Sequence, residues 1–181
     1  MLSYNIKIPH DRIAVLIGVD GKTKRRIEKA TKCEIDVESV EGEVTISGED
    51  GLALFDAQHI IKAIARGFNP TKALRLQKPD YSLELIDLQD YHDKKNHHER
   101  MKGRVIGKEG KSRRVIEQLA ECDVCVYGKT IGIIAPTETI GIAKKAIEML
   151  LEGANHSTVF TFLEKKRREQ KLASLMGAKK R

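Results

Sequence analysis

The sequence predicts an α+β protein with two copies of one small unit, each in the order strand, helix, helix, strand, strand, helix, followed by a basic helix. The first observation is an internal repeat, because residues 17–37 match residues 106–126 at a constant offset of 89, with nine of twenty-one positions identical. The second is a Gly-x-x-Gly sequence at the same place in both copies. A repeat of this length is one supersecondary unit used twice, so we expect the 181 residues to form two small domains.

The first copy begins with alternating apolar and polar residues, which predict a half-buried strand. Apolar residues at helical spacing then predict two helices around the glycines, and Gly42 marks a turn between two further strands. A long amphipathic helix, with Gly67 as its expected stop, ends the copy. The expected elements are strand 3–8, helices 11–17 and 22–31, strands 34–37 and 43–47, and helix 52–67.

The second copy follows a connector in which Leu74 and Leu76 indicate packing between the two halves. Its expected elements are strand 81–88, a first helix that includes 100–106, helix 111–121, strands 123–127 and 130–135, and helix 138–153. A last helix pattern covers residues 157–175. We therefore expect domains at 1–68 and 80–153, a connector at 69–79, an insertion at 90–99, and a basic C-terminal helix and tail at 154–181.

The glycine loops have the features of a phosphate site. Glycine permits backbone angles closed to other residues and lacks the Cβ that would hold a ligand away. A helix is expected to begin directly after each loop, so that its unpaired amides and positive dipole end face whatever lies over the loop. One such sequence could be a simple turn between helices, but two in register before cationic helices favour phosphate binding. The candidate nucleic-acid-binding residues are Ile106, Gly107, Lys108, Glu109, Gly110, Lys111, Arg113 and Arg114 in the second copy, and Gly18, Val19, Asp20, Gly21, Lys22, Lys24 and Arg25 in the first.

The two loops differ in charge. Asp20 lies between the first pair of glycines, with no base beside it, and an aspartate repels a phosphate. We therefore expect the loop at Gly107 to make the dominant contact. Apolar residues near the loops are candidates to support unstacked bases, although some of them must belong to the core. They are Ile13, Ile17 and Ile27 in the first copy, and Val105, Ile106 and Ile116 in the second.

Composition limits the class of protein. Hydrophobic residues make up 40% of the chain, yet no apolar run approaches the ~20 residues of a membrane span, and the first residues are not a signal peptide. We expect a soluble, cytoplasmic protein. The net charge is +7, and residues 164–181 contribute +6 of it, from eight basic and two acidic residues. This basic run could contact RNA or simply form a solubilising surface.

No signature of an enzyme stands out, and we expect neither catalytic activity nor a cofactor. His92, His97 and His98 lie among acidic residues and could hold a metal, but the lysines and asparagine between them are typical of a solvated loop. Cys122 and Cys125 have C-x-x-C spacing without a second pair. Cys33 and Cys122 occupy equivalent repeat positions at the start of a strand, and we interpret both as small core residues.

Ile-Gly-x-x-Gly-Lys within this order of elements resembles the KH domain of the eukaryotic type, type I, present here twice. The resemblance implies a three-stranded sheet backed by helices, and a groove that clamps about four single-stranded nucleotides against the glycine loop. The full-length layout, with the insertion and the basic terminal helix, is similar to the archaeal ribosome-assembly KH family that acts beside the Nob-one nuclease.

That family resemblance implies binding of single-stranded RNA near the 3′ end of small-subunit ribosomal RNA, during ribosome assembly and rRNA processing. It also implies two protein partners, the Nob-one nuclease and the alpha subunit of archaeal initiation factor two. Two alternatives stay open at this point. The chain could be a KH subunit of another RNA-processing machine such as an exosome cap, or a scaffold whose terminal helix docks on a partner.

Overall fold

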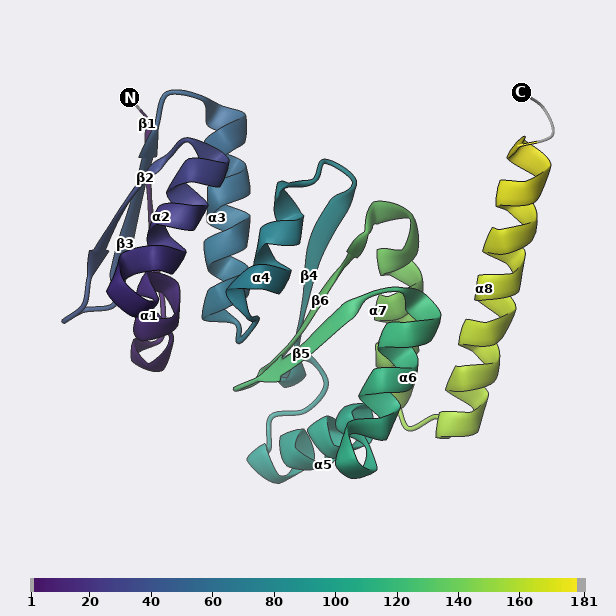
Figure 1. The fold of residues 1–181 in the computed structure, drawn as a ribbon. Coiled ribbons are helices and arrows are strands. Elements are labelled where there is room, and N and C mark those ends of the chain that lie inside the picture. The colour runs from purple at the N-terminus through teal and green to yellow at the C-terminus, as the bar shows by residue number, and fades with distance from the viewer. Residues whose placement is uncertain (1, 179–181) are drawn as a thin grey trace. The chain divides into compact units, whose positions relative to one another are not determined.

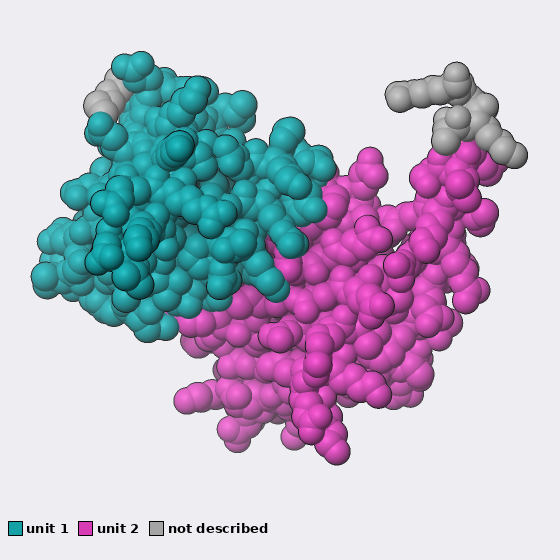
Figure 2. All heavy atoms as spheres, in the orientation of Figure 1, with its two compact units in different colours: residues 1–83 teal, residues 84–181 magenta. Residues whose placement is uncertain are grey.

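The computed structural model describes residues 2–178. The chain forms two compact units, Met1–Leu83 and Glu84–Arg181, which are coloured separately in Figure 2. Within residues 2–178, every helix is too short or too polar to cross a membrane. The α+β fold class predicted from the sequence is confirmed, because each unit contains a three-stranded sheet and the expected order of helices (Figure 1).

The first unit contains one sheet with the strand order β1-β3-β2. Both β1 and β2 pair antiparallel with the central β3, and β1 and β2 are therefore the edges. Figure 1 shows the helices of this unit gathered on one face of the sheet. The elements are β1 (Leu2–Lys7), α1 (His10–Ile17), α2 (Lys22–Thr31), β2 (Glu34–Glu38), β3 (Glu43–Gly48) and α3 (Gly51–Ala65).

Strand alternation explains which face of this sheet is covered. On β3, Val44 and Ile46 are fully buried against the helices, and Ile35 of β2 lies opposite Ile46 on the same face. The residues between them are polar or acidic and face the other side, as the period of two in a strand requires. Helix α2 contributes the fully buried Ile27 to the core, and α3 contributes a row of buried isoleucines.

The connector contains a short helix that the sequence did not reveal. Asn69 caps it by accepting the Thr71 amide at 2.9 Å, and Pro70 occupies the first helical position, where its missing amide costs nothing. A 3₁₀ turn follows, and its Gln77 donates a hydrogen bond to the Ala30 carbonyl at 2.7 Å. The connector therefore packs on the first unit through α2 and α3. Its elements are α4 (Pro70–Ala73) and the 3₁₀ turn Leu74–Gln77.

The second unit repeats the arrangement with the strand order β4-β6-β5. Helix α7 packs on β6, and α5 and α6 pack on α7. One continuous apolar core runs from Ile86 to Leu163 and includes the fully buried Ile116, Ile131 and Ile147. The elements are β4 (Tyr81–Asp87), α5 (Lys95–Ile106), α6 (Lys111–Ala120), β5 (Asp123–Tyr127), β6 (Thr130–Pro136) and α7 (Thr137–Leu151).

The interpretation of the histidine-rich insertion as a solvated loop is wrong for its second half. Helix α5 already begins at Lys95, and His98 is only 3% exposed. The ring of His98 is hydrogen-bonded to the carbonyl of His92, while the rings of His92 and His97 stack at 3.6 Å. Desolvation and the neighbouring His92 charge lower the pKa of His97 below its ordinary value. The histidines thus brace the start of α5.

Helix α8 (His156–Ala178) is divided between core and surface. Val159 and Leu163, one turn apart, are buried in the second core, and the helix packs on α6 and α7. From Glu164 to Lys171 the exposed residues are charged, and beyond them Leu172, Leu175 and Met176 are 61%, 65% and 71% exposed. The basic residues Lys179, Lys180 and Arg181 of the predicted tail lie outside the described residues.

In both units an arginine secures the end of the long helix. Arg12 donates hydrogen bonds to the carbonyls of Ile64 and Phe68, each at 2.8 Å. Arg104 donates in the same way to the carbonyls of Leu150, at 2.8 Å, and Ala154. Carbonyls at a helix end have no partner within the helix, so each arginine closes this gap and joins the first helix of its unit to the last.

Candidate nucleic-acid interface

The two glycine loops have the same backbone conformation. Gly18 and Gly107 both have φ 72° and ψ 174°, a region that is essentially reserved for glycine. Asp20 and Glu109 both have φ 53° and ψ 28°, which is the left-handed region. The repeat detected in the sequence is therefore also a repeat in the loop geometry.

The first glycine of each loop is required by the protein itself. A Cβ on Gly107 would lie 2.6 Å from Cβ of Ser112 and 2.8 Å from its amide nitrogen. A Cβ on Gly18 would lie 2.2 Å from the hydroxyl oxygen of Thr23. Thr23 and Ser112 are equivalent in the repeat, and each fills the space that its glycine leaves. Sequence reasoning missed both of them, although a small hydroxyl residue at the same helix position in both copies was a usable signal.

The second glycine of each loop faces open space. Among residues 2–178, and apart from its chain neighbours, no atom lies within 4 Å of a Cβ built on Gly21, and on Gly110 two arginine nitrogens lie at 4.0 Å. Both residues have φ close to 72° and are left-handed, which costs a residue other than glycine about 1 kcal/mol. Apart from the backbone conformation, nothing in the described part of the chain requires glycine here, and a ligand has room to approach the backbone closely.

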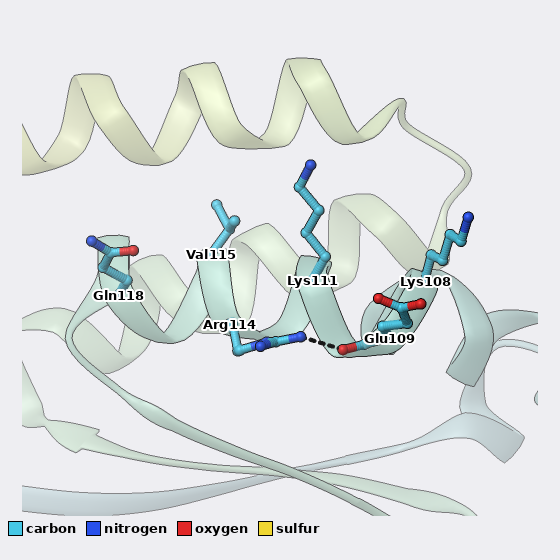
Figure 3. Close-up of a pocket in the computed structure, with 6 residues that line it drawn as sticks. All are labelled: Lys108, Glu109, Lys111, Arg114, Val115 and Gln118. Atoms are coloured by element: carbon cyan, nitrogen blue, oxygen red, sulfur yellow. Dashed lines mark hydrogen bonds between the residues drawn. The ribbon is translucent and has the colours of Figure 1, made fainter.

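Equivalent arginines hold the loops in shape. Arg25 donates to the carbonyl of Asp20 at 2.6 Å, and Arg114 donates to the carbonyl of Glu109 (Figure 3). Each arginine thus reaches back across the first turn of its helix to the left-handed residue of the loop. Both were predicted to contact nucleic acid, and the structure places them as supports of the loop.

Another shared residue connects the second helix to the sheet. Glu28 accepts the Ile35 amide at 3.0 Å, and Glu117 accepts the Val124 amide at 2.9 Å. Ion pairs with the same carboxylates involve Lys24 at 3.8 Å and Arg113 at 4.0 Å. Lys24 and Arg113, both predicted site residues, are therefore partly engaged within their own units.

The loop amides differ in their availability. The Gly110 amide donates to the Gly107 carbonyl, as the Gly21 amide does to the Gly18 carbonyl, each at 3.2 Å. Within residues 2–178, the amides of Lys108 and Glu109 have no backbone acceptor. Donors of this kind, next to the positive end of a helix, can accept an anion such as a phosphate.

The free positive charge is concentrated on the second loop. Lys22 is 3.9 Å from Asp20, so part of the first loop's charge is neutralised locally. Lys108 and Lys111 are exposed, and neither has an ion-pair partner among the described residues. They line a hollow of about 490 Å³ together with Glu109, Arg114, Val115 and Gln118. In Figure 3 both lysine side chains project away from the Arg114 hydrogen bond.

Burial separates the apolar candidates. Ile13, Ile27, Val105 and Ile116 are at most 6% exposed and belong to the cores. Ile17 and Ile106, directly before the glycines, are half-buried and reach the surface beside the loops. Val19 is 75% exposed. Of the predicted apolar residues, Ile17, Ile106 and Val19 are therefore the ones exposed enough to contact a base.

Other predicted features lie apart from the loops or serve the fold. Cys33 and Cys122 are buried, in agreement with their interpretation as core residues. Among residues 2–178, histidine, cysteine and acidic side chains form no group suited to holding a metal. The basic residues of α8 that the structure describes are on a helix that contacts α6, not on the loops.

Comparison with known proteins agrees with this geometry. Residues 82–168 match the family described as eukaryotic type KH-domain (KH-domain type I), and residues 3–63 match the KH domain family. The two halves of the chain are thus type I KH domains. The chain belongs to the family of KH domain-containing proteins that includes archaeal Dim2p and eukaryotic PNO1.

Several relatives support this assignment. A KH domain-containing protein of Methanocaldococcus jannaschii is 48% identical over 93% of this chain and 75% of the relative. The crystal structure of Dim2p from Pyrococcus horikoshii is 44% identical, with a TM-score of 0.86 over 91% of this chain and 99% of that chain. A second structure from that organism, an a/eIF2alpha-aDim2p-rRNA complex, has a TM-score of 0.87 at 44% identity over 93% and 95% of the two chains.

The eukaryotic relatives are longer. The pre-rRNA-processing protein PNO1 of Phaeosphaeria nodorum is 30% identical over 71% of this chain but only 50% of its own length. This chain therefore spans about half of those relatives.

Proposed function

We propose that this protein binds single-stranded RNA through its glycine loops and acts in ribosomal RNA processing, without catalytic activity of its own. The observation that carries the proposal is the second loop, where, within residues 2–178, two amides without backbone acceptors lie beside Lys108 and Lys111, which have no ion-pair partner there. A phosphate group of the RNA backbone would accept hydrogen bonds from such amides. The open space over Gly110 would allow the sugar-phosphate chain to approach closely.

The RNA we propose is the region near the 3′ end of small-subunit ribosomal RNA. Support comes from relatives whose names refer to pre-rRNA processing and from the Pyrococcus horikoshii complex that contains rRNA. The same complex contains a/eIF2alpha, so we propose that factor as a protein partner. The Nob-one nuclease as a further partner and a cytoplasmic location rest on the family resemblance alone.

The test is a change of charge in the second loop. Lys108→Asp together with Glu109→Asp places two aspartates between the glycines, and both positions are exposed, so the fold should be kept. We expect the affinity for the 3′-terminal segment of small-subunit rRNA to fall about tenfold or more, because a phosphate would meet repulsion where it met attraction. Fluorescence anisotropy with labelled RNA, and with a scrambled strand of equal composition, measures the effect.

The first loop offers a matched control. Val19→Asp produces the same pair of aspartates there, beside Asp20, on a residue that is 75% exposed. If the second loop dominates, this variant should lose clearly less affinity than the double variant. Unchanged affinity in the double variant would refute the phosphate site, and equal losses in both variants would refute the dominance of the second loop.

The basic end of α8 is tested separately. Deleting residues 165–181 keeps Val159 and Leu163 in the core. It removes eight basic residues and one acidic residue, Glu169, and so a net charge of +7. If this run contacts phosphates, the affinity should fall and depend less steeply on salt. An unchanged salt slope would assign the run to another role.

A further inference from the structure

A groove of about 510 Å³ lies between strand β1 and helix α3 of the first unit. Its walls combine apolar and cationic side chains. It lies at the opposite edge of the sheet from the glycine loop, because α2 is joined to β2 through Glu28 and Ile35, and β3 separates β2 from β1. The residues that line it are Tyr4, Ile6, Lys7, Ile8, Pro9, His10, Gln58, Lys62, Ala65 and Arg66.

Strand β1 forms one wall and is an unprotected sheet edge. Among the strands that the structure describes, it pairs with β3 alone. Residues 2–6 carry no charge, and Leu2 and Tyr4 are 52% and 42% exposed. Natural proteins usually blunt such an edge with charged residues or proline, because its unpaired backbone groups attract another strand. Here the first charged residue is Lys7 and the first proline is Pro9, both at the far end.

Helix α3 forms the other wall and has two different ends. Near its start, Leu52 and Phe55 are 70% and 55% exposed. Towards its end, Lys62 is exposed, and Arg66 is the residue directly after the helix. Neither cation, nor Lys7, has an ion-pair partner in the described part of the chain. Leu2 lies close to Gly51, so the apolar ends of strand and helix coincide.

The equivalent surface of the second unit has the opposite charge. Helices α3 and α7 are both fifteen residues long and start 86 residues apart. At this offset, Lys62 and Arg66 correspond to Glu148 and Glu152, and Phe55 corresponds to Gly141. The cations and the exposed aromatic ring on this surface are therefore features of the first unit that the repeat does not share.

We propose that this groove binds an extended, acidic segment of a protein partner, which adds to the sheet as a strand beside β1. Main-chain hydrogen bonds to the free edge would supply the pairing, apolar side chains would cover Tyr4 and Phe55, and carboxylates would meet Lys62 and Arg66. A nucleic acid is the less suitable occupant, since Glu49 and Asp50 at the start of α3 would repel a phosphate chain that follows the groove to its apolar end.

The probes are two synthetic peptides of about ten residues, long enough to follow β1 and its flanks at ~3.3 Å per residue. Each peptide has one half in which valine and threonine alternate and one half that carries glutamates. In the first peptide the glutamates are in the carboxyl-terminal half, and in the second they are in the amino-terminal half. We expect the full-length protein to bind one of them, and the order that binds gives the strand direction. Hydrogen exchange should show new protection of the β1 amides in the complex.

The variant Lys62→Glu with Arg66→Glu should weaken binding of that peptide at least about tenfold, since it reverses the two charges that select glutamates. The matched control is Lys145→Glu, an exposed lysine on the long helix of the second unit, which should leave peptide affinity unchanged. RNA affinity should be the same in both variants and the parent, so a failure of this proposal is distinguishable from a failure of the RNA site.

Three results would overturn the proposal. The first is equal binding of peptides with lysine in place of glutamate, and the second is binding that the double variant does not weaken. The third is displacement of the peptide by a single-stranded RNA together with weaker RNA binding by the double variant, which would make the groove an RNA surface.

Discussion

The two glycines of the second loop should respond differently to the same substitution, Gly→Ala. At Gly107 the new Cβ would lie 2.6 Å from Ser112 Cβ, and the backbone angles belong to a region that only glycine adopts readily. Strain of this kind costs of order 1–3 kcal/mol before the steric clash is counted. We therefore expect Gly107→Ala to lower the free energy of unfolding by about 3 kcal/mol.

At Gly110 no clash arises, because the nearest atoms are flexible arginine nitrogens at 4.0 Å. Only the left-handed backbone conformation is penalised, at about 1 kcal/mol. We expect Gly110→Ala to lower the melting temperature by roughly 4–8 °C, as this cost implies for a domain of fewer than 100 residues. The same methyl group should hinder an RNA backbone that approaches the loop closely. RNA affinity should therefore fall even at a temperature where the variant is fully folded.

Urea unfolding measures the stability of both variants, and fluorescence anisotropy measures their RNA affinity at a temperature where each is folded. Gly21→Ala in the first loop is the matched control, since its geometry is the same and its loop charge less favourable. The reasoning fails if Gly107→Ala is as stable as the parent. It also fails if Gly110→Ala binds RNA as tightly as the parent does.

Four further substitutions test the supports of the site and the packing of the second unit. Arg114→Met removes the hydrogen bond to the Glu109 carbonyl, and we expect several-fold weaker RNA binding with less than about 1 kcal/mol lost in urea unfolding; a large stability loss would show a different role. Leu163→Ala, at 1% exposure, should cost about 3 kcal/mol, whereas Leu172→Ala, at 61%, should be neutral in the same measurement. Arg104→Met leaves two helix-end carbonyls without their donor and should cost about 2 kcal/mol by thermal unfolding; a neutral result would contradict the capping role.

The repeat made the order of elements predictable from the sequence. Nine identical positions fixed the offset, and the alternation in each strand and the spacing in each helix did the rest. Helix α2 and strand β5 have the predicted bounds, and most other ends differ by one or two residues. Helix ends are set by local caps, which pattern reasoning places only to that accuracy.

The roles of the site residues were harder to predict. Identity at equivalent positions indicated importance, but it could not separate Arg25 and Arg114, which support the loops, from Lys22 and Lys111, which lie on the surface. That distinction depends on where a long side chain folds back, which is a property of three-dimensional packing. The helix at residues 70–73 was missed because four residues are too few for a periodic pattern.

The burial of His98 was missed for a related reason. Its neighbours Lys94, Lys95 and Asn96 are polar and exposed, and their composition dominated the interpretation of the insertion. Only the contact between the His98 ring and the His92 carbonyl reveals that one histidine turns inward.

In both units an arginine of the first helix donates to the carbonyls at the end of the long helix, but from different positions in the repeat. The acceptors correspond at an offset of 86, since Ile64 and Phe68 match Leu150 and Ala154. The donors do not, because at the loop offset of 89 Arg104 corresponds to Val15 and not to Arg12. The arginine thus lies three residues nearer the glycine loop in the second unit than in the first, which is almost one helical turn, and it donates to equivalent carbonyls in both. A protein engineer could use the same freedom by moving the arginine from position 12 to position 15. The helix-end carbonyls of the first unit would then have their donor at the position equivalent to Arg104.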